Sequence, residues 1–180
     1  GYDAFRPGQE AVVSALLAGR DVLAVMPTGV GKSVCYQVPA VVMEGMALVV
    51  SPLVSLMADQ VRAVQEAGIR GAYLNSTLAP GQQAEVLRRA AEGAYDLMYV
   101  APERLADPRF AEFARTARLA LIAVDEAHCV SQWGQDFRPS YLSIGQFIAE
   151  LPVRPPVAAL TATATDLVRR DIVRLLGLRD

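Results

Sequence analysis

Residues 21–33 read Asp-Val-Leu-Ala-Val-Met-Pro-Thr-Gly-Val-Gly-Lys-Ser. The mostly apolar run at residues 21–26 is typical of a buried strand, and the segment after Ser33 is compatible with a helix. Between them, glycines allow backbone N–H groups to curl around an anion beside the positive end of the helix dipole. A strand, a glycine-rich loop ending in Lys-Ser and a helix together predict a phosphate-binding loop in an α/β fold.

The loop departs from the strict pattern G-x-x-x-x-G-K-[ST] at one position, where Met26 replaces the first glycine. Lys32 is expected to reach the β- and γ-phosphates of a nucleotide, and the Ser33 hydroxyl is expected to ligate Mg²⁺. The alternative is a glycine-rich turn with a surface lysine. Lys32 is the only lysine among 17 basic residues, which favours the phosphate role. The residues expected to surround the phosphates are Thr28, Gly29, Val30, Gly31, Lys32 and Ser33.

Short apolar runs alternate with helix-compatible segments along the rest of the chain. The other expected strands are Met46–Ser51, Gly71–Leu74, Tyr95–Val100, Ala120–Asp125 and Val157–Thr161. The expected helices are Gly8–Ala18, Lys32–Met43, Leu53–Ala67 and Gly81–Ala91, with a closing helix and its tail within Asp166–Asp180. This alternation predicts a mostly parallel, twisted sheet covered by helices on both faces, with ligands at the carboxyl ends of the strands.

The strand expected at Ala120–Asp125 runs into Glu126-Ala127-His128. Two adjacent carboxylates at a strand end suit an ATPase, because Asp125 can hold the Mg²⁺ shell while Glu126 polarises the attacking water. An acidic strand-to-loop transition without catalytic meaning is the alternative. Together with the phosphate loop, the acidic pair predicts a nucleoside triphosphatase.

Composition sets broader limits. A chain of 180 residues fits one domain, and 53% apolar residues are enough for a large core. A net charge of −2 excludes nucleic-acid binding through the field of the whole domain, so any such contact is local. Cys35 and Cys129 lack metal-type spacing and fit reduced thiols of a cytoplasmic protein. There is no signal peptide or membrane span, and the missing initiator Met indicates a piece of a longer, soluble protein.

Several segments now carry a specific resemblance. The chain resembles the first RecA-like domain of the RecQ family of DNA helicases, within helicase superfamily 2. The matching segments, in the family's order, are Phe5-Arg6-Pro7-Gly8-Gln9-Glu10, Met26–Gln37, Val50-Ser51-Pro52-Leu53-Val54-Ser55-Leu56-Met57, Leu74-Asn75-Ser76-Thr77, Ala101-Pro102-Glu103-Arg104-Leu105, Asp125–His128, Ser131-Gln132-Trp133-Gly134 and Leu160-Thr161-Ala162-Thr163-Ala164-Thr165. The resemblance covers essentially the whole chain and implies ATP and Mg²⁺ as cofactors.

The resemblance implies roles at the nucleotide that spacing alone does not give. Tyr2 and Arg6 would hold the adenine ring between them, while Gln9 would hydrogen-bond its polar edge and select ATP. Without the family, Gln9 reads only as an exposed residue near a helix start. His128 is expected in a network with Thr161 and Thr163 that links the nucleotide to DNA, rather than in a metal site.

Val130–Ser140 resembles the family's aromatic-rich loop, which senses single-stranded DNA. Trp133 and Phe137 would stack on bases, and Arg138 would contact phosphate or pair with the catalytic carboxylates. The alternative is that both rings cap the core. Family members usually have His where this chain has Gln135, so the contribution of that imidazole to coupling is absent here.

Short polar side chains follow three other strand ends. By resemblance, segments 51–53, 75–77 and 102–104 line the nucleic-acid path, with Ser51, Asn75 and Ser76 as contacts to its backbone. Each segment fits a helix cap or turn equally well.

These observations predict that residues 1–180 are one N-terminal RecA-like domain that lacks its second RecA-like partner from the same parent chain. The expected activity is 3′-to-5′ unwinding of DNA with a single-stranded tail and duplex junction, in the bacterial cytoplasm or in a nucleus. The alternatives are an RNA helicase, a nucleotide-regulated binding module and, less favoured, a small-molecule kinase.

Overall fold

A computed structural model describes residues 4–27 and 31–179 of the chain. Within these residues the strands form a single sheet in the order β1-β6-β5-β2-β4-β3, and every neighbouring pair is parallel. The strands are β1 (Val22–Val25), β2 (Met46–Val50), β3 (Gly71–Leu74), β4 (Leu97–Val100), β5 (Leu119–Val124) and β6 (Val157–Thr161). The predicted parallel α/β sheet is therefore confirmed, with each expected strand present.

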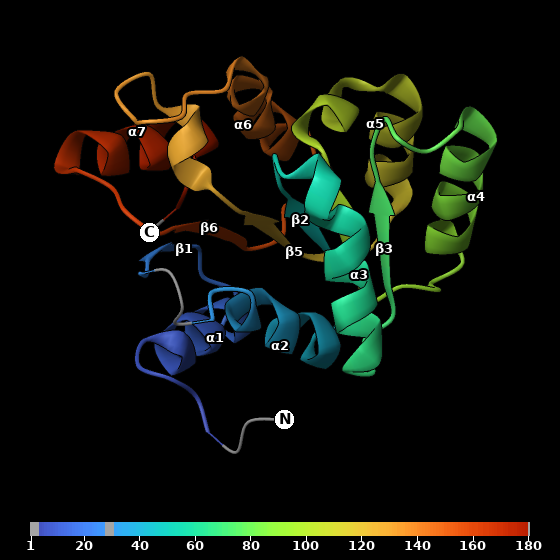
Figure 1. Cartoon of the computed structure of the whole chain (residues 1–180), viewed down its shortest axis with the longest axis horizontal. Coiled ribbons are helices and arrows are strands. Elements are labelled where there is room, and N and C mark those ends of the chain that lie inside the picture. Colours follow the sequence, from blue (N-terminus) through green and yellow to red (C-terminus); the bar gives the residue numbers. More distant parts are fainter. Residues whose placement is uncertain (1–3, 28–30, 180) are drawn as a thin grey trace.

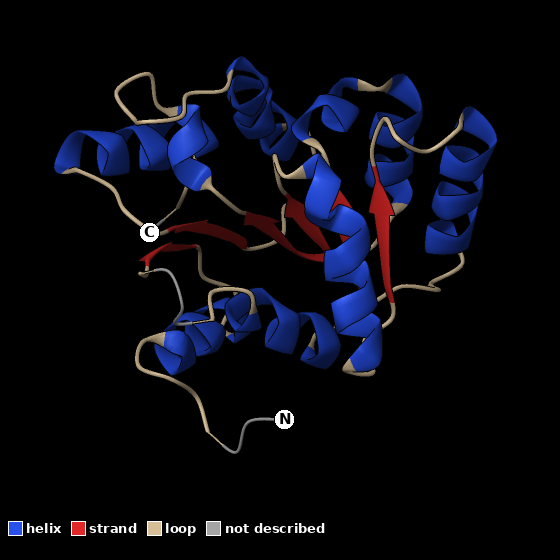
Figure 2. Ribbon diagram, in the orientation of Figure 1, coloured by secondary structure: helices blue, strands red, loops and turns tan. Residues whose placement is uncertain are grey.

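Helices cover both faces of this sheet (Figure 1). One face packs against α1 (Gln9–Leu17), α2 (Val34–Val42) and α3 (Met57–Glu66). The other packs against α4 (Pro80–Ala91), α5 (Pro108–Thr116), α6 (Leu142–Ala149) and α7 (Asp166–Leu176). Figure 2 shows the strands as a middle layer between the two groups of helices.

Alternation within each strand explains why the strands are apolar without a break. In β2, Leu48 and Val50 face the core beneath α4 to α7, whereas Ala47 and Val49 face the core beneath α1 to α3. Successive side chains of a strand point to opposite faces, so a sheet covered on both sides needs apolar residues at every position. All five residues of β2 are buried.

Two helices were missed by the sequence analysis. Helix α5 begins at Pro108, with the Asp107 carboxylate accepting a hydrogen bond from the Arg109 N–H at 2.9 Å. Helix α6 is short and contains Gly145, which weakens its helical signal. A methyl group at Gly145 would collide with the backbone carbonyl of Leu175, so the glycine permits α6 to pack closely on α7.

The helix expected at Leu53–Ala67 is also shorter than predicted. Residues Val54–Leu56 form a 3₁₀ turn, and the α-helix begins only at Met57. The segment after β5 has two further 3₁₀ turns, Ala127–Val130 and Pro139–Tyr141, which frame a loop at residues 131–138. No helix in the described part of the chain is long and apolar enough to cross a bilayer.

The edge strand β1 is fastened at its start by Asp21. The Asp21 carboxylate accepts hydrogen bonds from Arg154 Nη2 (2.7 Å), Val157 N–H (2.9 Å) and Arg179 N–H (2.6 Å). Burial alone raises the pKa of Asp21, but the hydrogen bonds from Arg154 and the two N–H groups outweigh it and hold this pKa below its usual value. These hydrogen bonds connect the strand that leads into the phosphate loop with the C-terminal part of the chain.

Candidate active site

The predicted site residues follow the carboxyl ends of the parallel strands, which lie at one edge of the sheet. The phosphate loop follows β1, and the acidic pair follows β5. Strand β6 lies between these two and ends at Thr161. The topology therefore brings three separate segments of the sequence, around residues 32, 125 and 161, to one site.

The described part of the phosphate loop leads directly into α2. Gly31 has φ of 73°, a left-handed conformation that favours glycine, and a Cβ there would lie 2.8 Å from Gln9 Nε2. Ser33 occupies the N-cap of α2, but its side chain makes no capping hydrogen bond. Tyr2, Thr28, Gly29 and Val30, which were also expected at the nucleotide, lie outside the described residues.

Gln9 is a support for this loop rather than an exposed residue at a helix start. Its side chain is buried; Nε2 donates to the Gly31 carbonyl at 2.9 Å, and Oε1 accepts the Arg6 N–H at 2.7 Å. The same residue thus connects the segment around Arg6, expected at the adenine, with the loop expected at the phosphates. Sequence alone did not show this contact, because the two segments are joined only by the fold.

Asp125 and Glu126 stand at the end of β5. One oxygen of the Asp125 carboxylate, Oδ1, accepts the Glu126 N–H at 2.9 Å. Burial, followed by the neighbouring Glu126 carboxylate, raises the pKa of Asp125, although the positive charge of Lys32 acts in the opposite direction. Burial disfavours the charged form of this carboxylate. A cation bound beside it would compensate that charge.

The backbone at Glu126 adopts an unusual conformation. Its φ of 51° is the only positive φ at a non-glycine residue among the described residues. Left-handed backbone at such a residue costs free energy and persists where surrounding contacts enforce it, commonly at functional sites. The Glu126 carbonyl accepts the Cys129 N–H at 2.9 Å, which begins the turn carrying His128.

His128 connects the acidic pair with the end of β6. Its Nδ1 lies 2.8 Å from Thr161 Oγ1 and 3.6 Å from Glu126 Oε2. Thr161 Oγ1 itself donates to the Thr163 carbonyl at 3.1 Å. Because a hydroxyl has one proton, Thr161 accepts from His128, which assigns the ring proton to Nδ1. The predicted contact between His128 and the threonines of segment 161–163 is therefore present.

The loop after this turn presents its tryptophan to solvent. The Trp133 side chain is 71% exposed, which rules out core capping for this ring, whereas Phe137 is half-buried. The base of the loop is fixed by Ser131, whose Oγ accepts the Trp133 N–H at 3.1 Å and donates to Asp171 of α7 at 2.7 Å. An exposed ring on a backbone held in this way is suited to stacking.

Arg138 pairs with Asp136 and not with Asp125 or Glu126, the pairing that was one of its two expected roles. Its Nη2 lies 3.2 Å from Asp136 Oδ2, so the guanidinium stays within the loop. The physical reason is proximity: Asp136 lies only two residues away and is exposed on the same loop. The second expected role, contact with phosphate, remains a prediction.

The three residues expected at the nucleic-acid backbone differ in accessibility. Ser51 is fully buried and its Oγ accepts the Leu53 N–H at 3.3 Å. Asn75 is also buried and its Oδ1 accepts hydrogen bonds from the N–H and hydroxyl of Thr77. Ser76 is exposed. In this geometry, Ser51 and Asn75 shape the turns at their strand ends, while Ser76 faces solvent.

Comparison with known proteins agrees with this arrangement. The profile of the DEAD/DEAH box helicase family matches residues 6–170. The chain belongs to the DEAD/DEAH box helicase family. It is 48% identical to the ATP-dependent DNA helicase RecQ of Bacillus subtilis, over 99% of this chain and 30% of that protein. It is 47% identical to the ATP-dependent DNA helicase RecQ of Haemophilus influenzae, over 100% of this chain and 29% of that protein.

The resemblance to RecQ helicases is therefore confirmed, and the chain spans about 30% of the length of these relatives. A solved structure, a hypothetical ATP-dependent RNA helicase from Sulfolobus tokodaii, superposes with a TM-score of 0.75 at 21% identity. The superposition covers 97% of this chain and 50% of the Sulfolobus tokodaii chain. This likeness confirms the RecA-like fold of the DEAD/DEAH box domain.

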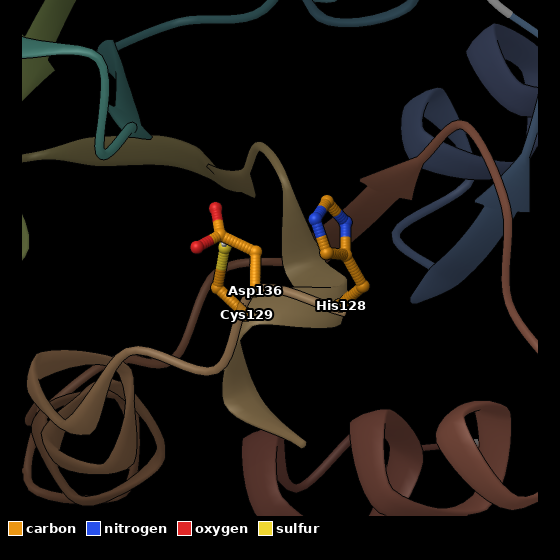
Figure 3. A group of neighbouring side chains, drawn as sticks. All are labelled: His128, Cys129 and Asp136. Atoms are coloured by element: carbon orange, nitrogen blue, oxygen red, sulfur yellow. Dashed lines mark hydrogen bonds between the residues drawn. The ribbon is translucent and has the colours of Figure 1, made fainter. Parts of the chain in front are cut away.

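The DEAD/DEAH box domain has one group of side chains with metal-ligand chemistry among the residues described. Ligand atoms of His128, Cys129 and Asp136 lie within 4.8 Å of one another. Figure 3 shows the Cys129 thiol beside the Asp136 carboxylate, with the His128 ring to one side. Burial raises the pKa of Cys129 to about 12, and His128 Nδ1 is engaged by Thr161. Cys129 Sγ also lies 3.9 Å from Asp136 Oδ2, so these contacts connect the turn after β5 with the loop at residues 131–138.

Asp125→Asn should raise the melting temperature of the metal-free DEAD/DEAH box domain at neutral pH, because burial and the neighbouring Glu126 carboxylate disfavour the charged form of Asp125. A carboxyl with a raised pKa stabilises the fold below its unfolded-state pKa, and this contribution is lost as pH rises through the folded-state pKa. At pH 7 the charged Asp125 therefore opposes folding, and the neutral amide removes that cost.

Thermal unfolding followed by circular dichroism measures this effect. Asp96→Asn is the matched control with the opposite sign, because a hydrogen bond from Arg70 lowers the pKa of Asp96. Its melting temperature should fall. A decrease with Asp125→Asn would contradict the interpretation of the buried carboxylate.

Proposed function

We propose that this chain is the ATP-binding RecA-like domain, at residues 1–180, of an ATP-dependent DNA helicase. One observation carries the proposal: the loop that displays Trp133 begins directly after the turn containing Glu126 and His128. A surface suited to stacking on bases is thereby joined to a site suited to phosphate hydrolysis. A simple nucleotide-binding enzyme has no need for that connection.

At the nucleotide, Lys32 compensates the charge of the β- and γ-phosphates, and Gly31 lets backbone N–H groups approach them. Ser33 and Asp125 would hold Mg²⁺, which would compensate charge on the phosphate oxygens. Their oxygen donors suit this hard cation, and the raised pKa of Asp125 fits a carboxylate whose charge a cation would offset. Glu126 polarises the attacking water.

The remaining contacts of the nucleotide follow the family resemblance. Tyr2 and Arg6 enclose the adenine ring, and Gln9 hydrogen-bonds its edge. Thr28, Gly29 and Val30 complete the phosphate loop. The contacts of Gln9 with Arg6 and Gly31 support only the proximity of the adenine segment to the phosphate segment, because both amide atoms of Gln9 bond to the backbone there.

At the nucleic acid, Trp133 and Phe137 stack on bases, and Arg138 and Ser76 contact phosphate. Ser51 and Asn75 support these contacts by shaping the turns at their strand ends. DNA is favoured over RNA because the relatives at 46–48% identity are named DNA helicases. By resemblance, the direction is 3′ to 5′ along a single-stranded tail toward a duplex junction, in the cytoplasm or in a nucleus.

The motor is completed by a second RecA-like domain of the same parent chain. In this proposal the residues of the chain contact one side of the nucleotide, and the described strands form one sheet. The length of the relatives, about three times that of this chain, leaves room for such a domain.

Trp133→Ala should abolish most DNA stimulation of ATP hydrolysis in the two-domain protein, while hydrolysis without DNA continues. The phosphate loop and the acidic pair are untouched by the substitution, whereas a stacking contact worth about 1–3 kcal/mol is removed. The measurement is steady-state phosphate release with and without single-stranded DNA.

Trp133→Phe is the matched control, because it keeps a ring at the same exposed position and should retain most of the stimulation. Full stimulation in a folded Trp133→Ala protein would contradict the role of the loop. Stimulation of the wild type by RNA alone would indicate an RNA helicase. Nucleotide binding without turnover would indicate a nucleotide-regulated binding module.

A further inference from the structure

The peptide unit between Asp125 and Glu126 is held at both of its polar atoms. Its N–H belongs to Glu126 and donates to Asp125 Oδ1 at 2.9 Å. Its carbonyl belongs to Asp125 and accepts the Tyr141 hydroxyl at 2.8 Å. Because a peptide unit is planar and rigid, these two hydrogen bonds set the directions in which both side chains leave the backbone.

This peptide unit needs such a restraint because of the conformation that follows it. Asp125 is still attached to the sheet, through its N–H and the Val50 carbonyl at 2.9 Å. Glu126 is already in the left-handed region, at φ of 51°. Turning the intervening peptide would relax Glu126 and redirect its carboxylate, so the Tyr141 hydrogen bond opposes a change that the backbone itself favours.

Tyr141 is also the residue at which the loop at 131–138 returns to the core. Its side chain is fully buried, and burial raises the pKa of Tyr141, so the hydroxyl keeps its proton and donates. The returning backbone is tied by two hydrogen bonds, from Arg138 N–H to the Cys129 carbonyl at 2.9 Å and from Tyr141 N–H to the Arg138 carbonyl at 3.0 Å. Along the chain, Trp133 and Phe137 therefore lie between the turn after Glu126 and Tyr141.

We propose that Tyr141 is a positioning residue that ties the nucleic-acid-contacting loop to the two carboxylates of the hydrolytic site. A displacement of the loop moves Tyr141, and its hydroxyl carries that displacement to the peptide that orients Asp125 and Glu126. The proposal rests on the proposed function of the loop at 131–138. It assigns to Tyr141 no contact with substrate.

The first experiment compares Tyr141→Phe with wild type in the two-domain protein. The substitution removes only the hydroxyl, and misplacement of catalytic groups by a fraction of an ångström should lower the DNA-stimulated kcat about tenfold or more. The KM for ATP and the DNA concentration for half-maximal stimulation should stay unchanged, because Lys32 and Trp133 keep their surroundings.

Ser143→Ala is the matched control. Ser143 Oγ also donates to a carbonyl of this region, that of Ser140 at 2.9 Å, but not to the acidic pair. It should keep the wild-type kcat. A wild-type kcat in Tyr141→Phe would overturn the proposal, as would an equal loss in Ser143→Ala, because that result would reflect general loosening of the loop.

A second measurement needs no hydrolysis and separates this proposal from the proposed function. In the 180-residue chain, amide hydrogen exchange of Glu126 should be faster in Tyr141→Phe than in wild type, since the peptide is less restrained. If the variant is too unstable, exchange in the wild-type chain is compared with and without single-stranded DNA. A change at both Trp133 and Glu126 supports the connection, whereas a change at Trp133 alone overturns it. If single-stranded DNA does not stimulate ATP hydrolysis by the wild-type two-domain protein, that result contradicts only the proposed function.

Discussion

The 180-residue chain, assayed alone with ATP, magnesium and single-stranded DNA, should hydrolyse ATP about 10³–10⁵-fold more slowly than the proposed two-domain protein. In the proposed motor, an arginine from the second RecA-like domain approaches the γ-phosphate from across the cleft and stabilises charge in the transition state. The many arginines of this chain do not replace it, because such an arginine must approach the γ-phosphate from across the cleft.

Phosphate release by the isolated chain and by the two-domain protein, measured under the same conditions, checks this expectation. The rate of the two-domain Lys32→Ala variant gives the background of the assay. The isolated chain should still fold and bind adenine nucleotide weakly. Strand separation by the isolated chain, free of longer protein, would show that the division of labour between two domains is wrong.

Glu126→Gln should lower the kcat for ATP hydrolysis in the two-domain protein by about 10²–10⁴-fold, the usual contribution of a positioned acid–base group. The amide has the shape of the carboxylate, so φ at Glu126 and the hydrogen bond to Asp125 are kept. It lacks the charge that polarises water. Nucleotide affinity should be unchanged, because Lys32 and Ser33 are intact.

Single-turnover hydrolysis and equilibrium nucleotide binding, measured on the same preparation, separate these two effects. Glu112→Gln makes the same chemical change on the exposed side of α5 and should behave as wild type. Equal turnover by Glu126→Gln and wild type would remove Glu126 from its assigned role.

The strands of this fold were predictable, because a sheet covered on both faces makes each strand apolar throughout. Val157–Thr161 and Gly71–Leu74 have the predicted bounds. Helices α5 and α6 were not predicted. The Asp107-Pro108 start of α5 is a local helix-start signal in the sequence. The need for Gly145 in α6 was invisible, since it arises from contact with α7, far along the chain.

The candidate site was predictable where chemistry leaves a local pattern and not where the fold supplies the partner. Lys32 and Asp125 were found because a phosphate loop and an acidic pair are local features. The left-handed backbone of Glu126 and the hydrogen bond from Tyr141 depend on packing and have no sequence pattern. Ser51 and Asn75 were expected at a surface because polar side chains at strand ends suit contacts with phosphate. Both are instead buried in turns.

The edge position of β1 has a consequence for how this chain folds during synthesis. Strand β1 pairs with β6 alone, and its first residues are fastened through Asp21 to Arg154 and to the backbone at Arg179. Strand β1 is therefore without this partner on the emerging chain until β6, at Val157–Thr161, has been synthesised. Such long-range closure slows folding and prolongs exposure of apolar edges. The strand that leads into the phosphate loop is thus paired only after β6 has been synthesised.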